Sequence, residues 1–295
     1  MTRIVTHLSG GGLGNQLFAI FTTIAYAIKH NRQFIFPYKK ILENCYIEYY
    51  RNTYWLNLLE KILHCTTYSN DIYSSEYLHL LPRYNEPSYN YTEIPDISNE
   101  HFAFTGCYQS YKYFEHQYHF IAGMIGIPMK LRNIRREFPE YFPENRHIVS
   151  MHFRLGDYKL KPEQHPILSI HYYDLAIQQI IIRRGIENPV VIVCCEEEDN
   201  EYVANVVNRL KEKYNEIDFM KIKDDIEDWK QLLIMSCCQD NIIANSTFSW
   251  WSAYFNEHLD KVVVTPNPWS GDENHDISDL IPENWIKIIY FNRTH

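Results

Sequence analysis

The second half of the chain alternates short apolar runs with longer amphipathic segments, and this alternation limits the possible fold more than any other feature. The apolar runs have the length and the β-branched composition of buried strands, and the segments between them have helical periodicity. The runs are HIVSMHFR (147–154), PVVIVCC (189–195), DFMKI (218–222), NIIAN (241–245) and KVVVTP (261–266). Strands and helices that alternate through short connections predict an α/β fold with a doubly wound parallel sheet.

The first half of the chain opens with the same kind of unit. Residues 3–8 are typical of a strand, and a glycine-rich turn follows them. Residues 17–30 favour a buried helix and residues 34–38 a second strand. This order of elements is typical of the start of a nucleotide-binding α/β unit.

A segment rich in proline and basic residues, 128–146, is typical of a linker between the two halves. We therefore expect two Rossmann-like domains, 1–145 and 146–295, that face a cleft in a GT-B-like arrangement. In folds of this type the ligand binds outside the carboxyl ends of the strands. Candidate site residues are accordingly those that directly follow a predicted strand.

The charge and the cysteine pattern argue against several classes of protein. A formal net charge of −9 and a pI of about 5.9 disfavour nucleic-acid binding, which needs a basic face. The seven cysteines include two vicinal pairs and no C-x-x-C, so neither a disulfide framework nor a zinc ribbon is indicated. With no secretory signal and no apolar run of roughly 18 residues, we expect a cytoplasmic protein that associates with a membrane at most peripherally.

The motif HFRLGDY (152–158) follows a predicted strand and carries the first candidate site residues. Arg154 is a permanent cation whose planar fork suits a phosphate. His152 shares the face of Arg154 on the strand, Gly156 permits a turn, and Asp157 is placed to hold the arginine. A purely structural ion pair between Arg154 and Asp157 is the alternative interpretation.

The motif GGGLGNQLF (10–18) lies between the first strand and its helix. Glycines such as Gly12 let a backbone approach a phosphate, and the N-terminus of the following helix favours negative charge. Asn15 adds a side-chain donor. A plain tight turn is the alternative interpretation.

The motif NSTFSWW (245–251) places hydroxyls and backbone N–H groups at the start of another predicted helix. The candidate binding residues here are Asn245, Ser246, Thr247 and Phe248. Asn245 or Ser246 could equally be only an N-cap. The two tryptophans that end the motif are interpreted as core residues rather than as platforms for a sugar.

Two absent motifs and one acidic run complete the site prediction. The chain has no D-x-D and no G-x-x-x-x-G-K-[ST], so we expect neither a bound metal nor a P-loop. A leaving diphosphate would then be stabilised by Arg154 and by helix N-termini. The acidic run Glu196–Asp199, which follows a predicted strand, is interpreted as a solvated charge run rather than as a wall of the nucleotide site.

Taken together, these motifs resemble the α-1,2-fucosyltransferase family, glycosyltransferase family 11. The main matches are GGLGNQL at 11–17, H-x-R-x-G-D-Y at 152–158 and NSTFSWW-x-A-Y at 245–254. Weaker similarities lie at 106–114, 165–177 and 266–269. The matches follow the order of the family and cover nearly the whole chain.

The resemblance implies metal-independent, inverting transfer of L-fucose from GDP-fucose to the 2-hydroxyl of a galactoside. It implies that GDP binds the C-terminal half, with Arg154 on the β-phosphate, His152 beside the guanine and the 245–251 turn on the diphosphate. Asn15 would face the donor across the cleft. A glycan acceptor would meet region 40–115, where Trp55 and the tyrosines are either sugar platforms or core residues.

One departure from the family keeps alternatives open. The family usually has a second arginine where this chain has Leu155, so another GDP-sugar such as GDP-rhamnose stays open as the donor. The general base also stays open, although Asp157 is the carboxylate nearest to the motif. A non-catalytic nucleotide-sugar-binding protein is a second class. A dinucleotide oxidoreductase is a third, but the chain lacks a clear G-x-G-x-x-G and a ribose-binding acid.

Overall fold

The structure is a computed structural model that describes residues 3–8, 10–43, 50–70, 72–272 and 278–290. The chain forms two compact units. The first comprises Met1–Pro128 and Asp276–Pro282, and the second comprises Met129–His275 and Glu283–His295. The units therefore divide between Pro128 and Met129, earlier than residue 145, and a short C-terminal segment belongs to the first unit.

Helix α4 (Ile127–Glu137) explains the position of the division. Its Arg135 donates to the carbonyl of Cys237, and the ammonium of its Lys130 lies 5.9 Å from the ring centroid of Trp229. The first half of the segment expected to be a linker, up to Glu137, is thus a helix that packs within the second unit.

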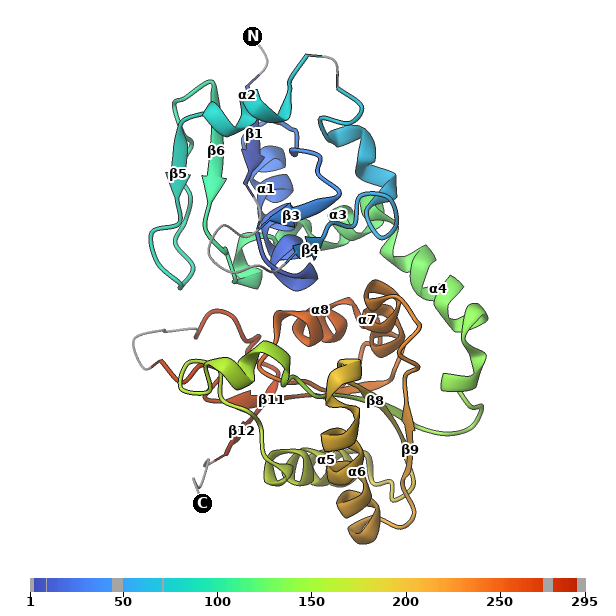
Figure 1. Ribbon diagram of the computed structural model, residues 1–295. Coiled ribbons are helices and arrows are strands. Elements are labelled where there is room, and N and C mark those ends of the chain that lie inside the picture. The colour runs from blue at the N-terminus through green and yellow to red at the C-terminus, as the bar shows by residue number, and fades with distance from the viewer. Residues whose placement is uncertain (1–2, 9, 44–49, 71, 273–277, 291–295) are drawn as a thin grey trace. The chain divides into compact units, whose positions relative to one another are not determined.

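The described part of the first unit contains a parallel sheet of four strands in the order β2-β1-β6-β5 (Figure 1). A β3-β4 hairpin and three α-helices accompany it. The bounds are β1 Ile4–His7, α1 Leu13–Lys29, β2 Gln33–Phe34, β3 Ile41–Glu43, β4 Tyr50–Asn52, α2 Ser75–Leu80, β5 Arg83–Asn85, β6 His101–Thr105 and α3 Tyr118–Ile125. Short 3₁₀ helices lie at η1 Glu60–Cys65, η2 Tyr111–Tyr113 and η3 Glu115–Gln117.

Helix α1 is the centre of the first unit. It is apolar on nearly every side and buried from Leu13 to Ala27 except at Asn15, as expected for a helix covered nearly all round. Its Tyr26 packs edge-on against Phe102 and Phe104 of β6. The strand expected at 34–38 is shorter than predicted, because pairing with β1 ends at Phe34.

In the second unit, the described residues form a parallel sheet of six strands in the order β12-β11-β10-β7-β8-β9. Helices α5 and α6 cover one face, and α7 and α8 cover the other (Figure 1). The bounds are β7 Ile148–His152, α5 Ile170–Arg184, β8 Val190–Cys194, α6 Asn200–Lys213, β9 Asp218–Lys221, α7 Asp228–Ser236, β10 Asp240–Ile242, α8 Thr247–Phe255, β11 Val263–Asn267 and β12 Ile286–Ile289. Three 3₁₀ helices, η4 Pro139–Tyr141, η5 Gly156–Leu160 and η6 Glu197–Asp199, join these elements. The doubly wound parallel sheet is confirmed, and β12 was not predicted.

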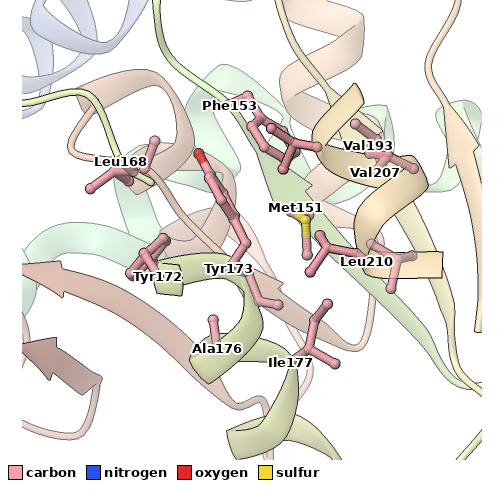
Figure 2. Close-up of a cluster of buried hydrophobic side chains, with 14 of the residues drawn as sticks. Met151, Phe153, Leu168, Tyr172, Tyr173, Ala176, Ile177, Val193, Val207 and Leu210 are labelled. Carbon is pink, nitrogen blue, oxygen red and sulfur yellow. The ribbon is translucent and has the colours of Figure 1, made fainter. Parts of the chain in front are cut away.

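The core under α5 and α6 fixes which side chains of β7 are left for a site. Met151 and Phe153 point into this core, with Tyr173 of α5 beside them (Figure 2). The rings of Phe153 and Tyr173 stack with centroids 4.0 Å apart. Because side chains alternate along a strand, His152 and Arg154 lie on the opposite side.

Candidate active site

The two candidate motifs of the second unit meet at one edge of its sheet. Strand β7 lies between β8 and β10, with His152 paired to Cys194 and Met151 paired to Ile242. All three strands are parallel, so the residues that follow them emerge at the same carboxyl edge. The structure therefore brings the 152–158 motif together with the 245–251 motif.

Arg154 stands at the centre of this edge. Its Nη2 donates to Asp157 and its Nη1 to Glu196, and the guanidinium lies 5.1 Å from the ring centroid of Tyr158. Burial works against the charge, but Glu196 and Asp157 outweigh it and raise the pKa of Arg154. The side chain is 17% exposed, so a cation is kept at this edge within reach of a ligand.

The turn after β7 is anchored by a carboxylate that the sequence reasoning missed. The N–H of Gly156, whose φ is +34°, donates to Oδ2 of Asp199 over 3.0 Å. The Asp199 side chain is fully buried, and its Oδ1 lies 2.5 Å from Nζ of Lys159. Interpreting Glu196–Asp199 as a solvated run is therefore wrong for Asp199, which the η6 turn folds inward. Glu196 is exposed but pairs with Arg154.

His152 is held as a neutral imidazole beneath the start of α8. It is buried, and its Nδ1 lies 2.9 Å from Oγ of Ser249. Burial, assisted by the positive charge of Arg154, lowers the pKa of His152 to about 3. The ring lies 5.5 Å, between centroids, from that of Phe248. Near neutral pH this histidine is uncharged, and its ring can donate one hydrogen bond and accept another.

The start of α8 is organised by Ser246 and Asn245. Ser246 is the N-cap of α8, and its hydroxyl accepts from the N–H of Phe248 over 3.3 Å. The amide of Asn245 donates instead to the carbonyls of Pro166 and Trp269, at 2.9 and 3.2 Å. Thr247 begins the helix, whose first backbone N–H groups favour an anion.

The remaining aromatic predictions concern the core. Trp250 and Trp251 are fully buried, which confirms their interpretation as core residues. Trp55, in the region expected to meet an acceptor, is also buried, with its ring 5.5 Å from that of Phe36. It is a core residue rather than a sugar platform.

Gly12 and Asn15 lie in the first unit, where the glycine turn links β1 to α1. Gly12 is the N-cap of α1. Gly11 has a φ of +82°, and a Cβ there would lie 2.7 Å from Nδ2 of Asn15, so glycine is required. Oδ1 of Asn15 accepts from Nε2 of Gln109 over 3.0 Å. The turn thus presents a helix N-terminus at the carboxyl end of β1, as the motif predicts.

Among the described residues, one acidic group has the spacing of a metal site. Oxygens of Glu196, Glu198 and Asp199 lie within 4.8 Å of one another. Two of the three already pair with cations, Glu196 with Arg154 and Asp199 with Lys159. These ion pairs oppose a further cation, so the group fits a metal poorly. Within the same residues, no helix has the length and apolar character needed to cross a membrane.

Known protein families include one that matches nearly the whole chain. The model of glycosyl transferase family 11 matches residues 11–289. The chain belongs to this family. The match includes the glycine turn, the Arg154 motif and the start of α8, which the sequence motifs had already assigned to the same family.

Two curated relatives come from Escherichia coli. The O-antigen biosynthesis glycosyltransferase WbnK is 34% identical over 155 residues, which are 49% of this chain and 46% of WbnK. An alpha-1,2-colitosyltransferase is 28% identical over 144 residues, which are 48% of this chain and 47% of that protein. The aligned part thus spans about half the length of each relative.

Solved structures share the fold at low sequence identity. POFUT1 in complex with GDP-fucose has a TM-score of 0.54 and 12% identity, covering 88% of this chain and 97% of POFUT1. An Arabidopsis thaliana FUT1 mutant in complex with GDP has a TM-score of 0.51 and 11% identity, covering 93% of this chain and 73% of FUT1. The expected GT-B-like α/β fold is confirmed.

Proposed function

We propose that this family 11 chain is a glycosyltransferase that uses a GDP-sugar, with GDP-fucose as the donor and the 2-hydroxyl of a galactoside as the acceptor. The observation that carries the proposal is the position of Arg154, a largely buried cation at the same carboxyl edge of a parallel sheet as the N-terminus of α8. A cation and a helix N-terminus at one edge suit a diphosphate. The GDP and GDP-fucose complexes of the structural neighbours support the same ligand class.

Arg154, His152 and the residues that begin α8 then have roles in donor binding. Arg154 binds the β-phosphate, and the turn formed by Ser246, Thr247 and Phe248 binds the diphosphate through the start of α8. His152 lies beside the guanine as a neutral donor or acceptor, in keeping with its lowered pKa. The second unit is accordingly the donor domain and the first the acceptor-side domain, to which Gly12 and Asn15 belong.

The proposed reaction is a single displacement with inversion at the anomeric carbon. As the bond to GDP breaks, negative charge grows on the β-phosphate, and Arg154 stabilises it. Asp157 positions Arg154 through the ion pair described above, so we do not assign it as the base that takes the proton of the acceptor hydroxyl. We propose that no metal is needed, since Arg154 and the α8 N-terminus supply the positive charge.

The donor sugar is the least constrained part of the proposal. One relative is a colitosyltransferase, and Leu155 replaces the family's second arginine, so a sugar close to fucose, such as colitose or rhamnose, is the main alternative. A non-catalytic nucleotide-sugar-binding protein is the alternative from another class. Binding and turnover separate these possibilities.

The test is a thermal-shift panel in EDTA, followed by turnover assays. The ligands are GDP, GDP-fucose, GDP-mannose, GDP-rhamnose, UDP-glucose and NAD, each applied to the wild type, Arg154→Ala and a control. The control is Arg132→Ala, because Arg132 is an exposed arginine of α4. A ligand that binds only the folded state raises the melting temperature by mass action.

We expect GDP and GDP-fucose to stabilise the wild type and Arg132→Ala but not Arg154→Ala. Transfer to a galactoside should follow without added metal. Stabilisation by a different GDP-sugar would keep the site and change the donor, whereas binding without turnover on any acceptor would favour the non-catalytic alternative. No response to any guanine nucleotide would refute the proposed function.

A further inference from the structure

The charge around Arg154 does not suit an anion as the structure stands. The guanidinium carries one positive charge, and Asp157 and Glu196 together carry two negative charges. The sum, +1 − 2, is −1. A phosphate that approached this group would meet net negative charge, so one carboxylate has to leave before Arg154 can bind it.

The two carboxylates differ in how they reach Arg154. Asp157 lies three residues along the chain from the arginine, in the same turn, and its side chain is 32% exposed. Glu196 comes from the loop after β8 and is 43% exposed, so its side chain can turn away into water. Glu196 is therefore the partner that is easier to displace.

Glu196 also occupies the space above the turn that follows β7. A Cβ built on Gly156 would collide with Oε2 of Glu196, while Oε1 of the same carboxylate accepts from Arg154. One carboxylate thus covers both the arginine and the glycine turn of the 152–158 motif. This is the place that a phosphate on Arg154 would take.

We propose that Glu196 is a displaceable internal counter-ion of Arg154, which holds the phosphate position in the free protein and yields it to the diphosphate of the donor. The inference rests on the proposed function, because the displacing ligand is the GDP portion of the sugar nucleotide. Glu196 is a positioning and selectivity residue, since it acts on the ligand through Arg154. Only a ligand with enough negative charge to replace a carboxylate binds well, and weaker anions are excluded.

The test measures binding of inorganic pyrophosphate, GDP and guanosine by isothermal titration calorimetry. Glu196→Gln should bind pyrophosphate and GDP about two- to fivefold more tightly than the wild type, which is the effect of removing one partly exposed ion pair. Guanosine has no phosphate, so its affinity should not change. The matched control is Glu197→Gln, which removes the same charge from the exposed neighbouring residue.

The background variant Arg154→Ala gives a second, independent readout. If Glu196 acts through Arg154, Glu196→Gln should have no effect on pyrophosphate binding in that background. Equal tightening by Glu196→Gln and Glu197→Gln would overturn the inference, because the effect would then be a general change of charge. Unchanged or weaker pyrophosphate binding by Glu196→Gln would also overturn it.

The pyrophosphate and GDP arms separate the two proposals. Tighter pyrophosphate binding by Glu196→Gln, without GDP binding to any variant, would uphold the counter-ion and refute the GDP-sugar donor. GDP binding to the wild type with no difference in Glu196→Gln would uphold the donor and refute the counter-ion.

Discussion

The hydroxyl of Ser249 lies 2.9 Å from Nδ1 of His152 and so joins the first turn of α8 to the end of β7. The same hydroxyl also accepts from the N–H of Ala244 over 3.2 Å. All of these groups are buried, so water cannot replace the hydroxyl if it is removed. This contact aligns two segments of the proposed donor site.

Ser249→Ala should lower the free energy of unfolding by about 1–3 kcal/mol, since it leaves buried polar groups without a partner. It should also weaken GDP binding, because the start of α8 loses its tie to β7. Urea unfolding and calorimetric titration with GDP measure the two effects. Ser252→Ala is the control, because the buried Ser252 hydroxyl only donates to the carbonyl of Ser249 within the helix. If Ser252→Ala lowered the free energy of unfolding as much as Ser249→Ala, the contact between Ser249 and His152 would have no special effect.

The lowered pKa of His152 predicts how stability changes with pH. The folded-state pKa of His152 is about 3, below the ordinary value of 6.5, so the unfolded chain binds more protons between these values. The contribution of the neutral His152 to the free energy of unfolding is fully present above pH 6.5 and is lost as the pH falls. The loss of unfolding free energy between pH 7.5 and pH 5.5 should amount to about 1.4 kcal/mol.

Urea unfolding of the wild type and His152→Gln at both pH values checks this expectation. Between pH 7.5 and pH 5.5, His152→Gln should lose about 1.4 kcal/mol less unfolding free energy than the wild type. His116→Gln is the control, because the His116 side chain is 89% exposed. A variant with the same pH dependence as the wild type would show that His152 is not held neutral by the fold.

Asn241 is the centre of a buried polar network under α7 and α8. Its Nδ2 donates to Ser150 Oγ over 2.7 Å and to the carbonyl of Met235 over 2.9 Å, and its Oδ1 accepts from Asn256. Asn241→Ala should cost about 2–4 kcal/mol, because it leaves several buried groups unpaired. Chemical denaturation measures the loss. The matched exposed substitution Asn208→Ala, on α6, should change stability by less than about 0.5 kcal/mol.

Leu155 is packed in the core between β7 and α5, with 4% of its surface exposed. Restoring the family's arginine by Leu155→Arg should therefore destabilise the protein by at least about 3 kcal/mol, because a charge would be buried without a partner. Thermal and urea unfolding test this. Leu155→Met, which keeps the volume and apolar character, should cost less than about 1.5 kcal/mol. A stable Leu155→Arg variant with tighter GDP binding would show that the side chain can turn toward the phosphate.

Much of the second unit was predictable from local patterns. The runs at 147–154, 189–195 and 241–245 each became a buried strand, because strands covered on both faces need near-continuous apolar sequence. The same reasoning predicts an anion site at Arg154, an isolated cation after such a strand, and this stays a prediction. Strand β12 was missed, because its four residues IKII are too short to be told from a loop.

The sequence by itself determined the α/β class, the glycine turn, the Arg154 motif and membership of the family, because each depends on residues close together in the chain. Only the tertiary structure decided that Glu196 and Asp199 contact the Arg154 motif. Both follow β8, about forty residues from Arg154 along the chain, and only the parallel pairing of β7 with β8 brings them to the same edge. An ion pair between residues so far apart along the chain leaves no local sequence pattern. Its carboxylates are therefore interpreted as solvated until the strand order is known.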